Sequence, residues 1–197
     1  MSKVIVFELL TLDGVMQAPG RPDEDQRGGF EHGGWAVPYA AMEASGNNTA
    51  NTSLLLGRRT YEDFYAVWPK RTGSSNTEVL NTTQKYVAST TLSEPLPWSN
   101  STLLKGDAVE AVARLKQELD NDLVVLGSRE LVQSLMRHQL IDEYVLLIHP
   151  LILGSGSRLF PEEQAFAALW LVDVKTMPTG VVVATYQSAE EDQRGSC

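Results

Sequence analysis

Two segments of the sequence each predict a buried strand, a glycine turn and the start of a helix. Residues 54–56 precede Gly57, and residues 123–126 precede Gly127. The first N–H groups of a helix have no partner within it, and the aligned peptide dipoles favour an anion there. Two such helix starts could hold the phosphates of one nucleotide. The pattern alone equally fits two tight strand-to-helix turns with no ligand.

Charge at the first turn favours the nucleotide hypothesis. Arg58 and Arg59 follow Gly57 directly and supply guanidinium groups suited to phosphate. The whole chain has a formal net charge of −9, from 16 Lys and Arg against 25 Asp and Glu. Such a balance opposes general binding to nucleic acid or to anionic membranes, although a local basic pocket is compatible with it.

The length and composition predict a single globular domain. The chain has 197 residues, 43% of them hydrophobic, and no apolar run approaches the roughly 20 residues of a membrane span. Glu8 comes too early for a signal peptide, and the only cysteine is Cys197. We expect a cytoplasmic protein, with one domain over residues 1–188 and a polar tail over 189–197.

Alternating patterns predict an α/β fold. Strands are expected at 4–10, 53–56, 85–88, 101–105, 123–126, 143–149, 168–175 and 181–187, and helices at 37–46, 60–67, 108–119 and 128–138. Asp107 and Glu110 form a capping-box pattern at the start of the third helix. Residues 17–34, rich in glycine and proline, predict a long loop that is functional or mobile. The order implies a mainly parallel sheet covered on both faces, with an antiparallel hairpin at its C-terminal edge.

Several short motifs in a fixed order carry a resemblance over residues 3 to 187. They lie at residues 11–16, 57–61, 89–90, 126–128 and 148–160. In this order the chain resembles the dihydrofolate-reductase-like family, in the branch of the riboflavin-biosynthesis reductase. The resemblance implies a three-layer αβα sandwich with a mixed, mainly parallel sheet, and NADPH as cofactor.

The resemblance also implies the roles of individual residues. Gly57, Arg58 and Thr60 correspond to the turn at the cofactor's 2′-phosphate and pyrophosphate. Ser89 and Thr90 correspond to the strand end beside the adenosine. Gly127, Ser128 and Leu131 correspond to the second glycine turn, under the pyrophosphate and nicotinamide ribose. Hydroxyl and free N–H groups suit phosphate oxygens, and glycine permits a close backbone approach.

The sequence departs from the family pattern in two places. Ser128 stands where a second glycine is usual, and its hydroxyl could cap the following helix or donate to a phosphate. True folate reductases carry a carboxylate on the helix over 37–46, whereas the matching position falls near Ala41 and the nearest acid is Glu43. We therefore expect dihydrofolate to be a poor substrate.

Candidate residues for the chemistry lie near the first strand. Asp13 could orient a substrate or support proton transfer, or it could be a turn residue of an Asp-Gly pair. Trp35 and Tyr39 could form a flat wall for a planar substrate, or could pack in the core or a lid. The three histidines are too scattered for a metal site, and His149 reads as a structural residue at a strand end. No metal is expected.

Together these features predict an NADPH-dependent reductase of a small, planar, heterocyclic substrate, acting by hydride transfer. The alternative is a non-catalytic nucleotide-binding or sensor protein on the same fold. Apolar residues over 146–153 and in the 168–187 hairpin predict a homodimer built near the C-terminal region.

Overall fold

The computed structural model describes residues 2–39, 51–71, 75–160 and 167–188. Its strands are β1 Val4–Thr11, β2 Thr52–Gly57, β3 Lys85–Ala88, β4 Ser101–Leu104, β5 Asp122–Leu126, β6 Glu143–His149, β7 Leu169–Thr176 and β8 Val182–Ser188. Its α-helices are α1 Arg58–Val67, α2 Ser75–Thr82, α3 Ala108–Glu118 and α4 Arg129–Arg137, and 3₁₀ turns cover Arg27–Gly29, Val37–Tyr39 and Trp68–Lys70. None of the described helices is long and apolar enough to cross a membrane.

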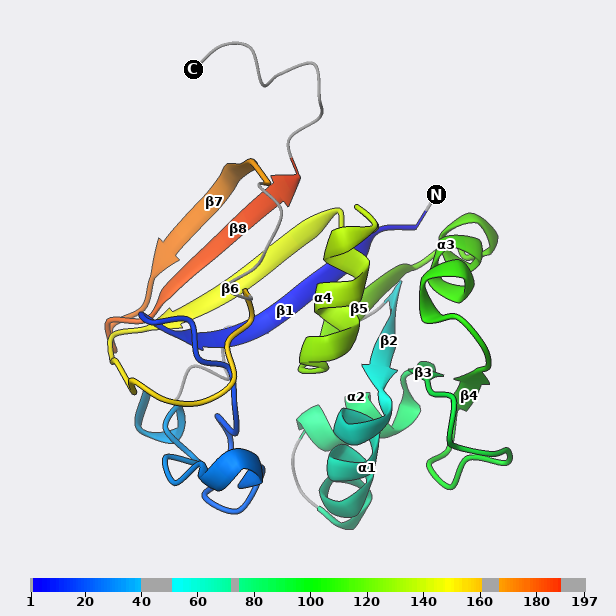
Figure 1. Ribbon diagram of the computed structural model, residues 1–197, viewed down its shortest axis with the longest axis horizontal. Coiled ribbons are helices and arrows are strands. Elements are labelled where there is room, and N and C mark those ends of the chain that lie inside the picture. The colour runs from blue at the N-terminus through cyan, green and yellow to red at the C-terminus, as the bar shows by residue number, and fades with distance from the viewer. Residues whose placement is uncertain (1, 40–50, 72–74, 161–166, 189–197) are drawn as a thin grey trace. The chain divides into compact units, whose positions relative to one another are not determined.

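The described strands form one eight-stranded sheet in the order β4-β3-β2-β5-β1-β6-β8-β7 (Figure 1). Pairing is parallel between β4, β3, β2 and β5, and antiparallel between β6, β8 and β7. The predicted α/β class, with a mainly parallel sheet and a C-terminal antiparallel hairpin, is therefore confirmed. Contacts divide the chain into two compact units, residues 1–5 with 47–140 and residues 6–46 with 141–197. The single domain expected over residues 1–188 stays a prediction.

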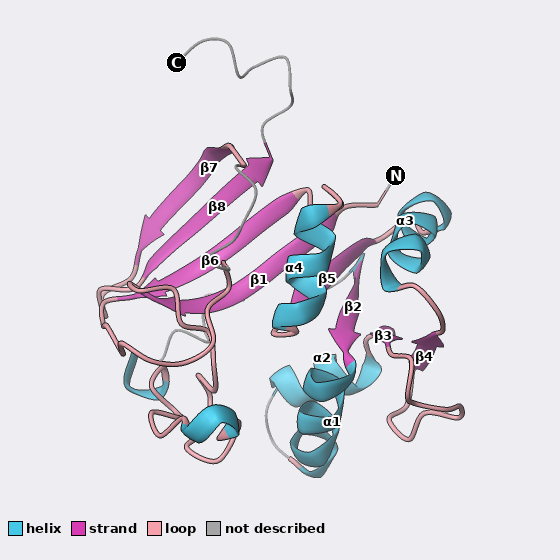
Figure 2. Cartoon of the chain, in the orientation of Figure 1, coloured by secondary structure: helices cyan, strands magenta, loops and turns pink. Residues whose placement is uncertain are grey.

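The first unit holds all four described α-helices (Figure 2). Tyr61 and Phe64 of α1 pack with Leu54 and Leu56 on one face of β2. Successive strand residues point to opposite faces, and Leu55, between these two leucines, is also fully buried. Both faces of β2 are therefore covered, as a parallel sheet requires.

Helix α2 is not among the helices expected from the sequence. The eight residues of α2 show little amphipathic pattern, but Leu80 packs against the cluster formed by Tyr61, Leu54 and Leu56. The residue after α2 and its loop, Lys85, is fully buried, with Nζ 2.6 Å from the Thr83 carbonyl oxygen and 3.2 Å from that of Ser99. The ammonium also lies 4.5 Å from the centre of the Trp98 ring. This lysine joins α2, β3 and the 98–100 segment.

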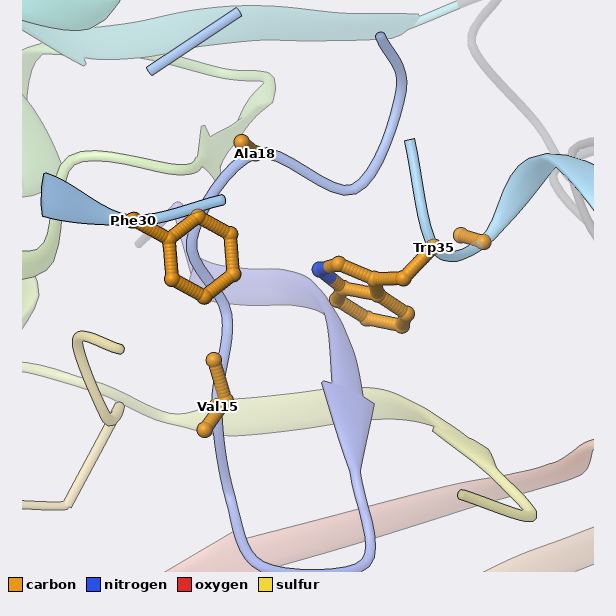
Figure 3. Close-up of a cluster of buried hydrophobic side chains, with 5 residues drawn as sticks. Val15, Ala18, Phe30 and Trp35 are labelled. Carbon is orange, nitrogen blue, oxygen red and sulfur yellow. The ribbon is translucent and has the colours of Figure 1, made fainter. Parts of the chain in front are cut away.

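The second unit contains strands and a long irregular segment over residues 12–39. Val15, Ala18, Phe30 and Trp35 form a buried cluster within it (Figure 3). The Trp35 indole N–H donates a 2.7 Å hydrogen bond to the carbonyl oxygen of Gln17. The expected loop over 17–34 is therefore packed onto its unit through buried aromatic side chains. Its glycines and prolines did not reveal this, because they report on backbone conformation only.

Most other predicted elements agree with the structure within two residues. The carboxylate of Asp107 accepts hydrogen bonds from the N–H groups of Val109 and Glu110, at 2.8 and 3.0 Å, and so caps α3 as expected. The helix predicted over 37–46 begins as a 3₁₀ turn at Val37–Tyr39, and its remaining residues lie outside the described part of the chain. Ala41, Glu43 and the tail over 189–197 lie outside it as well.

Candidate functional site

The two predicted glycine turns come together at one edge of the first unit. In the parallel ladders Leu55 is opposite Val125, and Gly57 is opposite Ala88, so β2, β3 and β5 end next to one another. The N–H of Gly57 donates a 2.8 Å hydrogen bond to Oγ of Ser128. We call the segments 57–60 and 127–131 the glycine-turn pair.

A second hydrogen bond ties the glycine-turn pair in the opposite direction. The N–H of Ser128 donates to Oγ1 of Thr60 at 2.9 Å. Gly127 has a φ of +57°, and a Cβ there would lie only 3.2 Å from Thr60 Oγ1. Backbone conformation and close packing therefore both require glycine at position 127.

Ser128 is a clamp between the two turns rather than a helix cap. It adopts a left-handed conformation, φ 59° and ψ 43°, and its side chain makes no capping hydrogen bond to α4. The hydroxyl instead donates to the Leu126 carbonyl oxygen at 3.1 Å while it accepts from Gly57. The capping role left open for Ser128 is therefore not the one observed, because its oxygen accepts the N–H of Gly57 instead of an N–H of α4.

Gly57 is not required by the protein itself. Its φ is −78°, which any residue adopts, and a Cβ would lie at an ordinary contact distance of 3.5 Å from Ser128 Oγ. The buried side chain of Leu131 lies next to Gly57: a Cβ added to Gly57 would be 3.9 Å from the Cβ of Leu131. The absence of a side chain at position 57 thus leaves the start of α1 open to a close approach.

Two arginines at the start of α1 pair with acidic side chains. Arg58 contacts Glu62 one turn along the same helix at 3.0 Å, and Arg59 contacts Glu130 of α4 at 3.2 Å. The side chains of Arg58 and Glu62 are 40% and 46% exposed, so solvent screens this pair and it contributes little to stability. Arg58 is free to exchange its partner for a ligand at small cost.

Ser89 and Thr90 lie just beyond β3, next to the Gly57 turn in the ladder. The Ser89 hydroxyl oxygen accepts hydrogen bonds from the N–H groups of Thr91 and Leu92, at 3.1 and 3.0 Å. Thr90 is exposed. The structure therefore brings all eight predicted cofactor residues to one edge of the first unit.

Asp13, in the second unit, is held by the 153–158 loop. Its carboxylate accepts hydrogen bonds from the N–H groups of Leu153 and Gly154, at 3.2 and 2.9 Å, and from the Thr11 hydroxyl at 2.6 Å. Burial alone would raise the pKa of this carboxyl, but these three donors outweigh it and lower the pKa of Asp13 to about 2. Of the two roles left open, the geometry favours the turn-fixing one.

Arg158 completes this attachment and was missed in the sequence. Its Nε donates to the backbone carbonyl oxygen of Asp13 at 2.9 Å, and one terminal nitrogen lies 3.5 Å from the carboxylate. The partners are 145 positions apart, so no local pattern connects them. In the sequence, Arg158 stood out only as part of the 148–160 motif, with no role for its side chain.

Trp35 and Tyr39 converge on His149 rather than on open space. Their rings lie 5.0 and 5.4 Å from the imidazole, both nearly perpendicular to it. His149 is fully buried, and Nδ1 lies 2.9 and 3.2 Å from the carbonyl oxygens of Leu147 and Leu10. Of the roles left open for Trp35, the geometry favours core packing, and His149 has the structural position expected for it.

Burial sets the charge of His149. It lowers the pKa of the imidazole below the ordinary value of 6.5, against the two carbonyl contacts, which raise it. The neutral ring then carries its proton on Nδ1, facing those carbonyls, a tautomer we assign from the contacts. Within the described part of the chain, Nε2 has no hydrogen-bond partner.

Comparison with known proteins identifies the family of this chain. The family model of the RibD C-terminal domain matches residues 2–183. The protein YyaP of Bacillus subtilis (strain 168) is 29% identical over 189 residues, which cover 93% of this chain and 94% of YyaP.

Solved structures show the same fold. A putative riboflavin biosynthesis protein from Shewanella sp. PV-4 superposes with a TM-score of 0.67 at 22% identity, over 95% of this chain and 99% of that one. Dihydrofolate reductase from Enterococcus faecalis, complexed with NADP(H), superposes with a TM-score of 0.58 at 16% identity, over 95% and 97% of the two chains. The fold is dihydrofolate-reductase-like, and the chain belongs to the RibD C-terminal domain family.

Proposed function

We propose that the protein is an NADPH-dependent reductase of a small planar substrate, a heterocycle or a conjugated carbonyl or imine compound. The observation that carries the proposal is the glycine-turn pair, in which two helix starts lie at one edge of one unit. Membership of the RibD C-terminal domain family supports a reductase. The dihydrofolate reductase that shares the fold is described as a complex with NADP(H), which supports this choice of cofactor.

The residues of the first unit fit the cofactor phosphates. The N–H groups at the starts of α1 and α4 have no intrahelical acceptors, and the helix dipoles favour an anion there. Arg58 supplies a guanidinium for a 2′-phosphate, and Thr90 supplies an exposed hydroxyl nearby in the ladder. The open position at Gly57 permits backbone-to-ligand contact. When bound, NADPH supplies the hydride.

Within the second unit, Asp13 has a positioning role. The Asp13 carboxylate is ionised at neutral pH and tightly held, so it orients the 153–154 backbone rather than moving a proton. Hydride transfer chiefly requires positioning and the exclusion of water, so an obvious acid–base residue is not needed. We expect dihydrofolate to be a poor substrate and the location to be the cytoplasm.

Gly57→Ala tests the cofactor site without disturbing the fold. Because an alanine fits the backbone and packing there, the free energy of unfolding should change by no more than about 1 kcal/mol, the usual effect at a helix N-cap. NADPH affinity, measured by fluorescence titration, should fall at least tenfold. Gly106→Ala is the control for lost stability: its φ of +85° strains an alanine, so it should lower the free energy of unfolding without lowering NADPH affinity.

Turnover is tested by following NADPH oxidation by absorbance across a panel of planar carbonyl and imine compounds. If Gly57→Ala binds NADPH as tightly as the unmodified protein, or if the unmodified protein does not bind NADPH, the proposed cofactor site is wrong. A non-catalytic nucleotide sensor is the second candidate, favoured by the Ser128 hydroxyl, which occupies the Gly57 N–H. Tight NADPH binding without turnover of any compound would select the sensor.

A further inference from the structure

A cavity of about 240 Å³ lies within the second unit, between the 27–30 and 155–157 segments. The side chain of Gln17 connects these two segments. Its Nε2 donates to the carbonyl oxygen of Arg27 at 2.9 Å, and its Oε1 accepts from the N–H of Ser157 at 3.0 Å. Gln17 is only 7% exposed, so the wall of this pocket is fixed before any ligand arrives.

Backbone N–H groups point the chemistry of the pocket towards an acceptor ligand. Within the described residues, no protein group accepts a hydrogen bond from the N–H of Gly28, Ser155 or Gly156. The hydroxyls of Ser155 and Ser157 add further possible donors to the lining. Among the acceptors of the lining, Oε1 of Gln17 and the carbonyl oxygens of Arg27 and Ser157 already receive hydrogen bonds from the protein.

The glycines of the pocket leave these donors uncovered. Gly28 and Gly29 have φ values of +70° and +75°, with nothing within 4 Å of an added Cβ. Gly156 packs on the opposite side, where a Cβ would lie 2.7 Å from the ring of Phe30. The backbone of Gly28 and Gly29 is therefore accessible at the pocket, while Gly156 packs against the ring of Phe30. Accessible backbone N–H groups suit a small group with several oxygens.

Charge agrees with the donor pattern. The chain carries 25 acidic residues and a net charge of −9, yet no Asp or Glu lines this pocket. The nearest acid in sequence, Asp25, is turned to the guanidinium of Arg27, with contacts of 2.6 and 2.9 Å. Arg27 is part of the lining. The lining therefore presents N–H groups and no carboxylate to an anion, while the guanidinium of Arg27 is already paired with Asp25.

We propose that this pocket binds small oxyanions, either a phosphate or a carboxylate group. The site uses the second unit alone, and does not depend on the proposed reductase activity or on NADPH. A bound oxyanion would bridge the 27–29 and 155–157 segments through charge-assisted hydrogen bonds.

The test is a titration of the full ¹⁵N-labelled chain without NADPH, followed by amide NMR. Inorganic phosphate and acetate are the two probes, and sodium chloride at matched ionic strength is the control. We expect saturable shifts of the Gly28, Ser155 and Gly156 amides with at least one probe, at a Kd of about 1 mM. Phosphate alone, acetate alone or both would identify the oxyanion class.

Ser155→Asp and Ser155→Asn form the matched pair of variants, since Ser155 is exposed and tolerates either side chain. The aspartate should raise the Kd at least tenfold by repulsion, whereas the asparagine should change it by less than about threefold. Unchanged amide dispersion elsewhere would show that both variants fold. Shifts that do not saturate with either probe, shifts reproduced by sodium chloride, or equal affinities of the two variants would overturn the proposal.

Discussion

The backbone N–H of Ser128 lies 2.9 Å from Oγ1 of Thr60, across 68 positions of sequence. The hydroxyl of Ser128 in turn accepts the N–H of Gly57, so the start of each helix is fixed by a residue of the other turn. This reciprocal contact sets the separation between the starts of α1 and α4. In the proposed cofactor site, that separation determines whether one ligand meets both helix starts.

Thr60→Val should weaken NADPH binding about tenfold and destabilise the protein. Valine keeps the shape of threonine but removes the acceptor of the Ser128 N–H. This donor is partly buried, so the loss should cost about 1 kcal/mol, the low end of the range for an unpaired buried donor. Thr60→Ser retains the oxygen and is the control. Fluorescence titration with NADPH and urea unfolding measure the two effects. If valine binds NADPH as well as serine does, the reciprocal contact does not shape the cofactor site.

Arg58→Ala should erase a preference for NADPH over NADH. We expect the unmodified protein to bind NADPH at least tenfold more tightly, which corresponds to about 1.4 kcal/mol. Arg59→Ala is the matched control, because the Arg59 guanidinium is directed to Glu130 of α4. Calorimetric titration with both cofactors gives the ratio, and equal affinities in the unmodified protein would contradict the assignment of Arg58.

Asp13 should make the protein sensitive to acid. Its folded-state pKa of about 2 lies below its ordinary value of 3.8, so its contribution to stability is present above about pH 4. That contribution is lost as the pH falls towards 2. Urea unfolding from pH 5 to pH 2 should show a smaller loss in Asp13→Asn than in the unmodified chain.

The strands and turns were predictable because their signals are local. Apolar runs that end at glycine located β2 and β5, and Asp107 marked the start of α3. Helix α2 was missed because the apolar periodicity of its sequence is weak. In the fold, Leu80 of α2 packs onto the cluster of α1 and β2, a contact that the local sequence does not indicate. Local propensity was a weaker guide than tertiary contact there.

The site was predictable as a set of turns but not as a network. The sequence indicated Gly57 and Ser128 separately, whereas their hydrogen bond spans 71 positions. The role of Asp13 depends on N–H groups 140 and 141 positions away, so the sequence left two roles open. Short patterns thus report which residues end a strand, and long-range contacts decide what their polar groups do.

His149 should make stability fall in mild acid. Its folded-state pKa is lowered, so the unfolded chain binds more protons as the pH falls below 6.5. The free energy of unfolding should therefore decrease from pH 7.5 to pH 5.5. His149→Gln removes the titration and should flatten this dependence. An equal slope in His149→Gln and in the unmodified protein would refute this origin.

We predict a homodimer built near the C-terminal hairpin. Strand β7 ends the strand order, and its Trp170, Leu171, Val172 and Val174 are 48% to 53% exposed. Apolar edge strands favour pairing with another chain. Light scattering at micromolar concentration should give twice the chain mass of 21.7 kDa. Val174→Lys should produce a monomer, whereas Val37→Lys, at another exposed valine, should not.

The buried Lys85 has a consequence for chemical labelling. Burial lowers its pKa to about 8, which would make an accessible amine unusually reactive near neutral pH. Its Nζ is nevertheless enclosed by backbone carbonyl oxygens and the Trp98 ring, so an acylating reagent reaches it only when the first unit opens. The acylation rate of Lys85 therefore measures how often the first unit opens locally.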